Sequence, residues 1–599
     1  MFTTRPELAG TFGMVSSTHW LASAAGMAVL ESGGNAFDAA VAAGFTLQVV
    51  EPHLNGPGGE VPVLFATAED PNPRVLCGQG VAPAGATIEH YRGEGLDVVP
   101  GTGLLAATVP GAMGGWLALL RDHGTRTLRE VLGYAIDYAA NGHPIVPRVN
   151  TTISTVADMF RDAWPTSAAV WLPGGQPPAA GERFANPTLA ATYRRLLAEA
   201  EAAGPDREAQ LEAAHRAWYS GFVAEAIDRF CRREFLDNSG SAHAGVITGE
   251  DLARWRPSYE QPVRLDWQGL TVCKVAGWSQ GPVLLAQLAM LDALGELPAY
   301  GSADQVHAVV EVAKLAFADR EAWYGDVPDV PTDTLLSPGY ARDRAALVAR
   351  QASLELRPGH PDGREPRLAR YVLEAHDGPV VGAGLGEPTV RAGLGEPTID
   401  PAGTTRGDTC HVDVVDRWGN MVSATPSGGW LQSSPTIPEL GFCLGTRGQM
   451  FWLEEGLSSS LAPGRRPRAT LSPSLALRDG QPFMAFGTPG GDQQDQWQLC
   501  FLLARHAGMN LQEAIDAPAW HTTAFPASFF PRQTVPGEVV VESRLGTEVI
   551  DELRRRGHRV RVAGDWALSR MTAVSRDPDT GVLRAGANPR GMQGYAAGR

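Results

Sequence analysis

The chain has 599 residues, 44% hydrophobic and 19% charged, which is typical of a globular protein large enough for several domains. Its formal charge of −16 argues against nucleic acid or an anionic membrane as a partner, because both bind basic surfaces. The first residues lack the basic segment and apolar stretch of a secretion signal, and no uninterrupted apolar run reaches about 18 residues, so we expect neither export nor a membrane span.

The 6 cysteines and 14 histidines argue against structural disulfides and bound metals. The cysteines lie far apart and form no Cys-x-x-Cys pair, and the histidines show no His-x-x-x-His spacing. Reduced thiols of this kind are typical of a cytoplasmic protein. We therefore expect a cytoplasmic protein that has no metal or other cofactor.

The sequence of the first half of the chain predicts helices that alternate with short strands. After Ser17, apolar residues recur at helical spacing, and Gly33-Gly34 ends this helix. Asn35 and Asp38 predict the N-cap of a second helix, which runs to about Val50. Both helices are rich in Ala and Gly, so we expect them to pack closely on a sheet. Further predictions are a buried strand at 61–65, a short helix with a capping box of Thr248 and Asp251, and an amphipathic helix at 304–324.

The second half differs in composition and in its predicted elements. Between about 357 and 406 the sequence shifts to Gly, Pro and charged residues, and the stretch 383–389 is repeated at 392–398. We expect a mobile surface tether there. After 409 strands dominate, with a late helix at 545–556 and a hairpin-like region at 571–587. This order favours a layered α+β domain whose sheets draw on both halves of the chain.

Residues 407–411 read Gly-Asp-Thr-Cys-His and lead into an apolar alternation at Val412 and Val414. A hydroxyl residue that opens a strand after a loose loop is a place where a chain can cut itself and use the new terminus. Thr409 would then supply both a nucleophile and a base, because its hydroxyl attacks and its freed α-amine, with a reference pKa near ~8, takes the proton. Thr409 is therefore the candidate catalytic residue.

Short motifs stand in a fixed order along the chain: 31–40, Ala82-Pro83, Val109-Pro110-Gly111, 247–252, Ala318-Asp319-Arg320, Thr409-Cys410-His411, 487–491 and Asn588-Pro589-Arg590. Their order resembles the γ-glutamyltransferase family of N-terminal-nucleophile hydrolases over nearly the whole chain. The resemblance implies a four-layer αββα fold and a precursor that cuts itself between Asp408 and Thr409. Residues 1–408 and 409–599 would then stay together as a heterodimer of a large and a small catalytic subunit. Cys410 occupies a position that is usually Thr in this family.

The resemblance also implies the groups that assist Thr409. Ser427 stands where the family has a hydroxyl that hydrogen-bonds the nucleophile, and Thr425 lies two residues earlier on the same strand face. Gly490 and Gly491 match the family's oxyanion hole, where glycine lets backbone N–H groups approach a developing negative oxygen. Either hydroxyl could instead fill a strand, and the two glycines could instead form a tight turn.

The residues that would bind a γ-glutamyl group are altered. Gln79 stands where the family has an arginine that grips the donor's carboxylate, and a neutral amide cannot supply that charged fork. Aromatic residues follow Gln449 where an acid is expected. Burying a zwitterion there without partners costs several kcal/mol, so glutathione should be a poor donor. The substrate-binding candidates are Gln79, Gly429, Trp430, Gln449, Trp452 and Thr470.

The leading hypothesis is a self-processing N-terminal threonine hydrolase or acyltransferase that acts on an amide or activated carbonyl outside γ-glutamyl chemistry, as cephalosporin acylases and an oxamate amidohydrolase of this family do. A second hypothesis is a C–C bond-cleaving homologue in an actinobacterial pathway to 4-alkylproline antibiotic units. A third is a true γ-glutamyl transferase or glutathione hydrolase, in which Arg74 or Arg447 replaces the missing charge. The last is an inactive scaffold. In each active case the partner is a small-molecule substrate.

Overall fold

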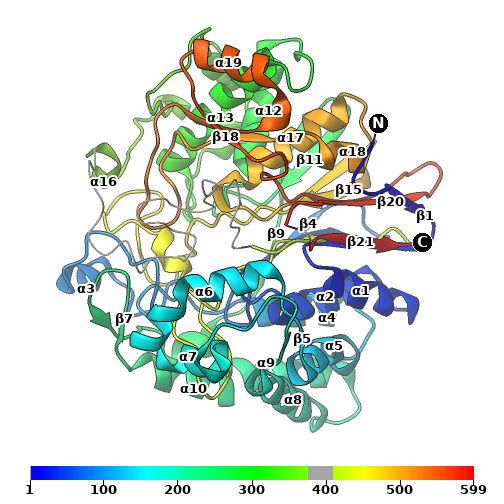
Figure 1. Ribbon diagram of the computed structural model, residues 1–599, viewed down its shortest axis with the longest axis vertical. Helices are drawn as coiled ribbons and strands as arrows, with labels where there is room; N and C mark the ends of the chain where they lie inside the picture. Colours follow the sequence, from blue (N-terminus) through cyan, green and yellow to red (C-terminus); the bar gives the residue numbers. More distant parts are fainter. Residues whose placement is uncertain (1, 375–408, 592) are drawn as a thin grey trace.

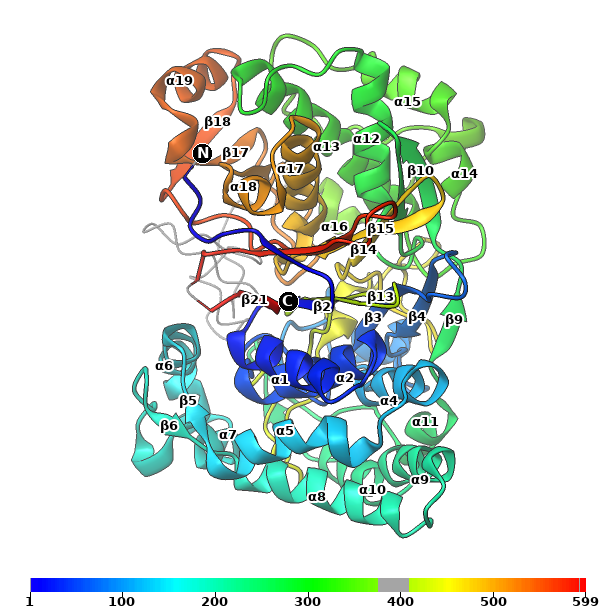
Figure 2. The ribbon, with the colours of Figure 1, turned by 90° about the vertical axis from the view of Figure 1, so that its right-hand side faces the viewer.

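The computed structural model describes residues 2–374, 409–591 and 593–599. The chain forms four layers, in which two seven-stranded antiparallel sheets lie face to face between two layers of helices (Figures 1 and 2). This is the αββα arrangement that the sequence predicts. The first sheet has the order β21 (Tyr595–Gly598), β2 (Gly13–Ser17), β12 (Val412–Asp416), β13 (Met421–Ala424), β3 (Val61–Ala66), β4 (Arg74–Gly78) and β9 (Ser258–Glu260). The second has the order β1 (Leu8–Gly10), β20 (Leu583–Ala587), β19 (Thr572–Arg576), β15 (Gln481–Gly487), β14 (Ser474–Arg478), β11 (Leu270–Lys274) and β10 (Val263–Trp267).

The two helices predicted near the start of the chain cover the outer face of the first sheet. They are α1 (Trp20–Glu31) and α2 (Ala36–Val50), and α4 (Ala112–His123) and α5 (Leu128–Asn141) lie in the same half of the molecule (Figure 2). The capping box is confirmed, because the Asn35 side chain accepts from Asp38 N at 3.0 Å and the Asp38 carboxylate accepts from Asn35 N at 2.9 Å. The opposite helical layer contains α12 (Pro282–Leu294), α13 (Ala303–Trp323), α17 (Gln494–His506) and α18 (Leu511–Asp516).

Strand β12 contributes to two cores at once. Val412 and Val414 belong to the apolar cluster shared with α2, whereas Val415 belongs to the cluster between the two sheets, together with Val574. Since side chains of a strand alternate between faces, the alternation in the sequence places this strand in the middle of the sandwich. It lies between β2 and β13, with which it pairs on either side.

Most other predicted elements are present. The short helix α11 (Gly249–Arg254) begins at the Thr248 and Asp251 capping box. The late helix is α19 (Thr547–Arg555), and β19 and β20 form the predicted antiparallel hairpin. Helix α17 was not predicted, because its buried face carries glutamines as well as apolar residues. All six cysteines are buried free thiols. Within the described residues, no helix is long and apolar enough to span a membrane.

The beginning of the predicted tether is packed against the body of the protein. Gly359 accepts a hydrogen bond from Trp323 Nε1 at 3.2 Å and donates its N–H to Asp319 at 2.6 Å, and Ala369 is buried. Residues 357–374 therefore do not form the loose segment that composition suggested, because individual side chains such as Trp323 fix them. The repeated stretch and the proposed boundary between 408 and 409 involve residues outside the described part of the chain.

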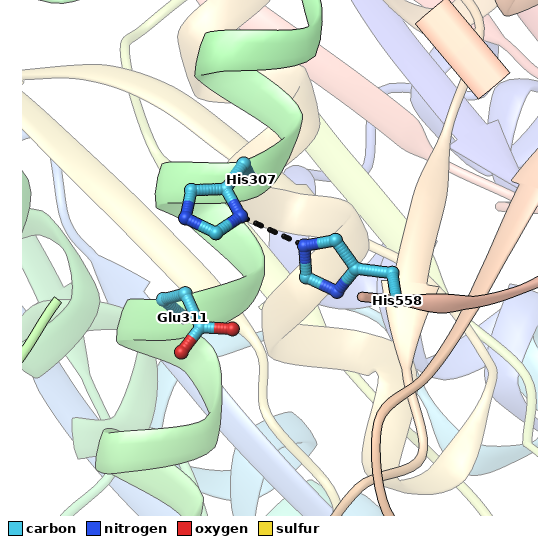
Figure 3. A group of neighbouring side chains, drawn as sticks. All are labelled: His307, Glu311 and His558. Carbon is cyan, nitrogen blue, oxygen red and sulfur yellow. Dashed lines mark hydrogen bonds between the residues drawn. The ribbon is translucent and has the colours of Figure 1, made fainter. Parts of the chain in front are cut away.

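Two buried histidines tie α13 to the segment before β18 (Arg559–Ala563) (Figure 3). His307 Nδ1 and His558 Nε2 are 2.8 Å apart, and His307 Nε2 lies 2.7 Å from the carbonyl oxygen of Ala349. Because a carbonyl can only accept, His307 Nε2 carries the proton and its Nδ1 accepts from His558 Nε2. Glu311 lies one helical turn from His307 on the same face of α13.

His307, Glu311 and His558 form a group of the kind that binds metals, with ligand atoms within 4.8 Å of one another. The charge around Glu311 argues against that use. Lys314 forms an ion pair with Glu311, and Arg357 Nη2 lies 3.6 Å from its other carboxylate oxygen. Since two cations already balance the carboxylate, a metal ion would meet electrostatic repulsion. We interpret the group as a structural tie between α13 and β18.

The histidine pair predicts a component of the acid sensitivity of the fold. Burial, with Lys314 and His307 acting in the same direction, lowers the pKa of His558 to about 3. The unfolded chain binds this proton below about pH 6.5 and the folded chain does not, so stability falls as the pH drops from 6.5 toward 3. His558→Gln keeps a donor for His307 and removes the titration.

Between pH 7 and pH 4.5, wild-type protein should therefore lose about 2 kcal/mol more unfolding free energy than His558→Gln. Urea unfolding at both pH values measures the difference. Identical losses in the two proteins would contradict the assignment.

Candidate active site

Four strand ends of the first sheet meet at one edge. Because neighbouring strands are antiparallel, the start of β12, the end of β13, the start of β3 and the end of β4 lie together. Pairing continues beyond the strands, since Ser427 bridges to Thr409 on one side and to Glu60 on the other. Gln79 directly follows β4. The sheet therefore places the predicted nucleophile beside its predicted hydroxyl partner.

The hydroxyls of Thr409 and Ser427 are 3.3 Å apart and both residues are fully buried. Arg447 Nη2 donates to Ser427 Oγ at 2.8 Å. With one lone pair of Ser427 engaged by Arg447, the Ser427 proton can point to Thr409 Oγ1. A hydroxyl that donates to Thr409 Oγ1 stabilises the negative charge that develops on this oxygen when it loses its proton.

Arg447 is held by a buried carboxylate. Its Nε donates to Glu60 Oε1 at 2.6 Å, and both side chains are at most 2% exposed. The guanidinium carbon also lies 5.2 Å from the Trp430 ring centre and 5.5 Å from that of Phe529. Sequence comparison offered Arg447 as a replacement for the missing substrate-binding charge, but Glu60 already balances it. Glu60 was not predicted, because no motif marks it.

Thr425 lies beside His411. The two side chains are 2.8 Å apart, from Thr425 Oγ1 to His411 Nδ1, and His411 Nε2 lies 2.9 Å from Asp413 Oδ1. Asp413 in turn accepts from Thr572 Oγ1 at 2.6 Å, which joins the two sheets. Thr425 shares a strand face with Ser427 as predicted, and its hydroxyl supports His411, two residues after the nucleophile.

The predicted oxyanion glycines form a turn after β15. Gly490 has φ +130° and Gly491 has φ +49°, and a Cβ at Gly490 would collide with the Trp497 ring. Both positions therefore require glycine for conformational reasons. The turn begins close to the nucleophile, because Gly487 packs against the ring of His411. A role as hydrogen-bond donors in catalysis is compatible with this placement and is part of the function proposed below.

Three substrate-binding candidates follow β4 and β13, and each has a different environment. Gln79 is buried, its Nε2 donates to the carbonyl oxygen of Gly80 at 3.3 Å, and it lines a cavity of about 620 Å³. Gly429 has φ +65° and packs against the backbone of residues 58–59. Trp430 is fixed by a 2.9 Å hydrogen bond from its indole N–H to the carbonyl oxygen of Leu54. The ring of Trp430 contributes the predicted aromatic surface near Arg447.

Of two further candidates, Gln449 lies in the 3₁₀ turn η4 (Arg447–Met450) and Trp452 follows it by two residues. Gln449 donates to the carbonyl oxygen of Gly101 at 3.1 Å and accepts from Phe530 N at 3.0 Å. Trp452, predicted as part of an aromatic pocket, instead donates its indole N–H to Glu321 at 2.8 Å and has Arg532 stacked 3.8 Å from its ring centre. The region is therefore rich in buried charge, which the sequence did not reveal.

Thr470 is the remaining substrate-binding candidate. It is 1% exposed, and its hydroxyl has no hydrogen-bond partner among the residues that the structure describes. Gln79 Oε1 likewise lacks one within this part of the chain. Buried polar atoms are normally satisfied, so these two atoms are available to a ligand or to water.

Comparison of the chain with known proteins identifies its family. The sequence profile described as Gamma-glutamyltranspeptidase matches residues 22–598, so the chain belongs to this family. It is 30% identical to the "Glutathione hydrolase-like YwrD proenzyme" of Bacillus subtilis (strain 168), covering 98% of this chain and 99% of that protein. It is 32% identical to the "Acylase ACY 1 proenzyme" of Pseudomonas sp. (strain SE83), covering 98% and 95%. The structure titled "Structure of LmbA2991HD" has 61% identity, a TM-score of 0.93 and 100% coverage of both chains.

The buried pair predicts a large penalty for removing one partner. Arg447→Met leaves Glu60 without its cation in the interior, which should cost about 3–5 kcal/mol of unfolding free energy. The double variant Arg447→Met with Glu60→Gln should recover a large part of this loss, because no uncompensated charge remains. Urea unfolding measures all three proteins.

Arg555→Met serves as the matched control, because the Arg555 side chain is 71% exposed. The prediction is wrong if Arg447→Met is as stable as this control.

Proposed function

We propose that this chain is a self-processing N-terminal threonine hydrolase or acyltransferase that acts on an amide or activated carbonyl other than a γ-glutamyl group. The observation that carries the proposal is the placement of Thr409 three residues before β12, 3.3 Å from the Ser427 hydroxyl that Arg447 orients. Membership of the γ-glutamyltranspeptidase family, whose compared relatives are named proenzymes, supports it.

In the precursor, the Thr409 hydroxyl would attack the carbonyl carbon of Asp408. The peptide nitrogen leaves as the new α-amine of Thr409, and the resulting ester is opened by water, which returns the free hydroxyl. In the mature protein that amine accepts the hydroxyl proton while the oxygen attacks the substrate carbonyl. The carbonyl C–N bond of the substrate then breaks, the leaving amine departs with that proton, and the acyl group stays on Thr409 Oγ1. Water or an acceptor amine next attacks this ester and releases the acyl group, which restores the Thr409 hydroxyl.

Two groups would stabilise charge along this path. The Ser427 hydroxyl, which accepts from the buried Arg447, would donate to the Thr409 oxygen 3.3 Å away. Backbone N–H groups at Gly490 and Gly491 would receive the oxyanion of the tetrahedral intermediate. The loss of one such donor typically raises the barrier by about 3 kcal/mol. Neither contribution requires a metal or an organic cofactor.

The altered residues favour a substrate other than glutathione. Gln79 is neutral, and its amide N–H bonds to the neighbouring carbonyl oxygen of Gly80 rather than projecting a charged fork. Arg447 is balanced by Glu60. One of the relatives compared is named an acylase, which supports a donor outside glutathione chemistry. Cleavage of a C–C bond is the alternative outcome, and analysis of the products distinguishes it from amide hydrolysis.

Self-cleavage provides the first test. Thr409→Ala should leave the purified chain as a single band on denaturing electrophoresis, whereas wild type gives two bands and the smaller one begins at Thr409. Cys410→Ser is the matched control, because a serine hydroxyl can replace the thiol that donates to Glu51 at 3.1 Å, and this variant should still be cut. A Thr409→Ala chain that splits at the same bond would show that its hydroxyl is not the nucleophile.

The substrate argument has its own test. Wild-type protein should turn over a γ-glutamyl-anilide about 100-fold more slowly than a typical γ-glutamyltransferase, because Gln79 supplies no charged fork at the position where the family's arginine grips the donor's carboxylate, and about 3 kcal/mol of recognition is lost. Release of the aniline is followed spectrophotometrically. Turnover at the rate of the reference enzyme would overturn this argument while leaving the nucleophile intact.

A further inference from the structure

A long loop between β16 (Trp520–Thr522) and β17 (Glu538–Glu542) is anchored on η4, the turn that carries Arg447. Phe529 packs against Trp430 and Met450. Phe530 N donates to Gln449 Oε1 at 3.0 Å, and Arg532 Nη2 donates to the carbonyl oxygen of Gln449 and, at 2.8 Å, to that of Phe451. Arg532 is therefore joined through one short turn to the side chain that orients Ser427.

Arg532 is a buried cation with an incomplete set of partners. The residue is 4% exposed, and its guanidinium carbon lies 3.8 Å from the Trp452 ring centre. Its Nη1 has no hydrogen-bond partner in the described ranges, and its Nη2 bonds only to the neutral backbone carbonyls of Gln449 and Phe451. The hydrogen bonds of this buried guanidinium therefore go to neutral groups, and the Glu321 carboxylate compensates its charge only through space.

The neighbouring carboxylates are already engaged. Glu321 pairs with Arg468 at 2.8 Å, and Asp492 pairs with Arg320. All four side chains are at most 1% exposed. Two negative groups thus face two arginines, and Arg532 adds a third positive charge. Burial lowers the pKa of Arg532 to about 9; the Glu321 carboxylate acts to raise it, and Arg468 and Arg320 act in the same direction as burial. The cluster is short of one negative charge.

We infer that Arg532, on the loop beside η4 rather than at the end of β4 where Gln79 stands, binds a carboxylate of the substrate. The inference rests on the proposed function and narrows its substrate to a carboxylic acid that also carries the amide or activated carbonyl. An anion at Nη1 would supply the missing charge and complete the guanidinium's hydrogen bonds.

Monoamides of dicarboxylic acids test the inference, because each carries one amide and one carboxylate. The probes are oxamate, malonamate, succinamate and glutaramate, and each is compared with its neutral diamide. Binding to full-length, self-cleaved protein is measured by titration calorimetry, and ammonia release is followed in parallel. At least one acid should bind wild type about 30-fold or more tightly than its diamide, since a buried charge pair commonly contributes that much.

Three variants define the role of Arg532. Arg532→Gln should bind the acid and its diamide equally. Arg532→Lys keeps the charge but not the planar fork, so the preference should fall about tenfold without vanishing. Arg555→Gln removes an exposed arginine and should retain the wild-type preference. If Arg532→Gln does not fold, the preference of Arg532→Lys for the acid over its diamide is compared with that of wild type. An equal preference in the two proteins contradicts the inference.

The test of the carboxylate site and the test of the proposed function have different readouts. Cleavage before Thr409 reports on the nucleophile and does not require Arg532. A wild-type protein that is cut but discriminates none of the acids from its diamide overturns the carboxylate site alone. A preference that persists in Arg532→Gln does the same. A chain that is never cut overturns the proposed function. Calorimetry on that uncut chain still shows whether it binds an acid more tightly than the matching diamide.

Discussion

The buried ion pair between Arg447 and Glu60 holds the candidate site together. It joins the residue before β3 to the turn η4, and Arg447 also reaches the Ser427 hydroxyl after β13. These three segments are distant in sequence, and none of them would orient Ser427 alone. A charge pair in the interior contributes little net stability compared with apolar residues of the same size, so its value lies in fixing one arrangement.

That arrangement depends on sheets built from both sides of the proposed cut. Strands β12 and β13 follow residue 409, yet they lie between β2 and β3, which precede it. Breaking the chain before Thr409 removes one covalent bond and none of the ladder hydrogen bonds between these strands. The nucleophile can therefore acquire a free amine while its position remains fixed by neighbours on both sides. The relatives named proenzymes fit this design.

Local patterns predicted the parts of this structure that local forces determine. The capping box of Asn35 and Asp38 is visible in sequence because its partners are three residues apart. Thr409 and Ser427 could be expected to meet because a tight turn joins their strands. Glu60 and Arg532 could not be found in this way, since their contacts come from segments far away in the chain. The sequence of the second half predicts mainly strands for a related reason. Buried glutamines interrupt the apolar residues of α17, so the helical spacing of its buried face is not visible in the sequence.

The interleaved strands also restrict how the protein can be assembled. If residues before 409 were produced alone, β2 and β3 would each present an unpaired edge where β12 and β13 belong. Exposed edges of apolar strands recruit other chains, and the separate piece would tend to aggregate. Production of the two segments as independent genes should therefore fail unless they meet during folding. A single polypeptide that carries both segments keeps β12 and β13 close to their partner strands while the two sheets form.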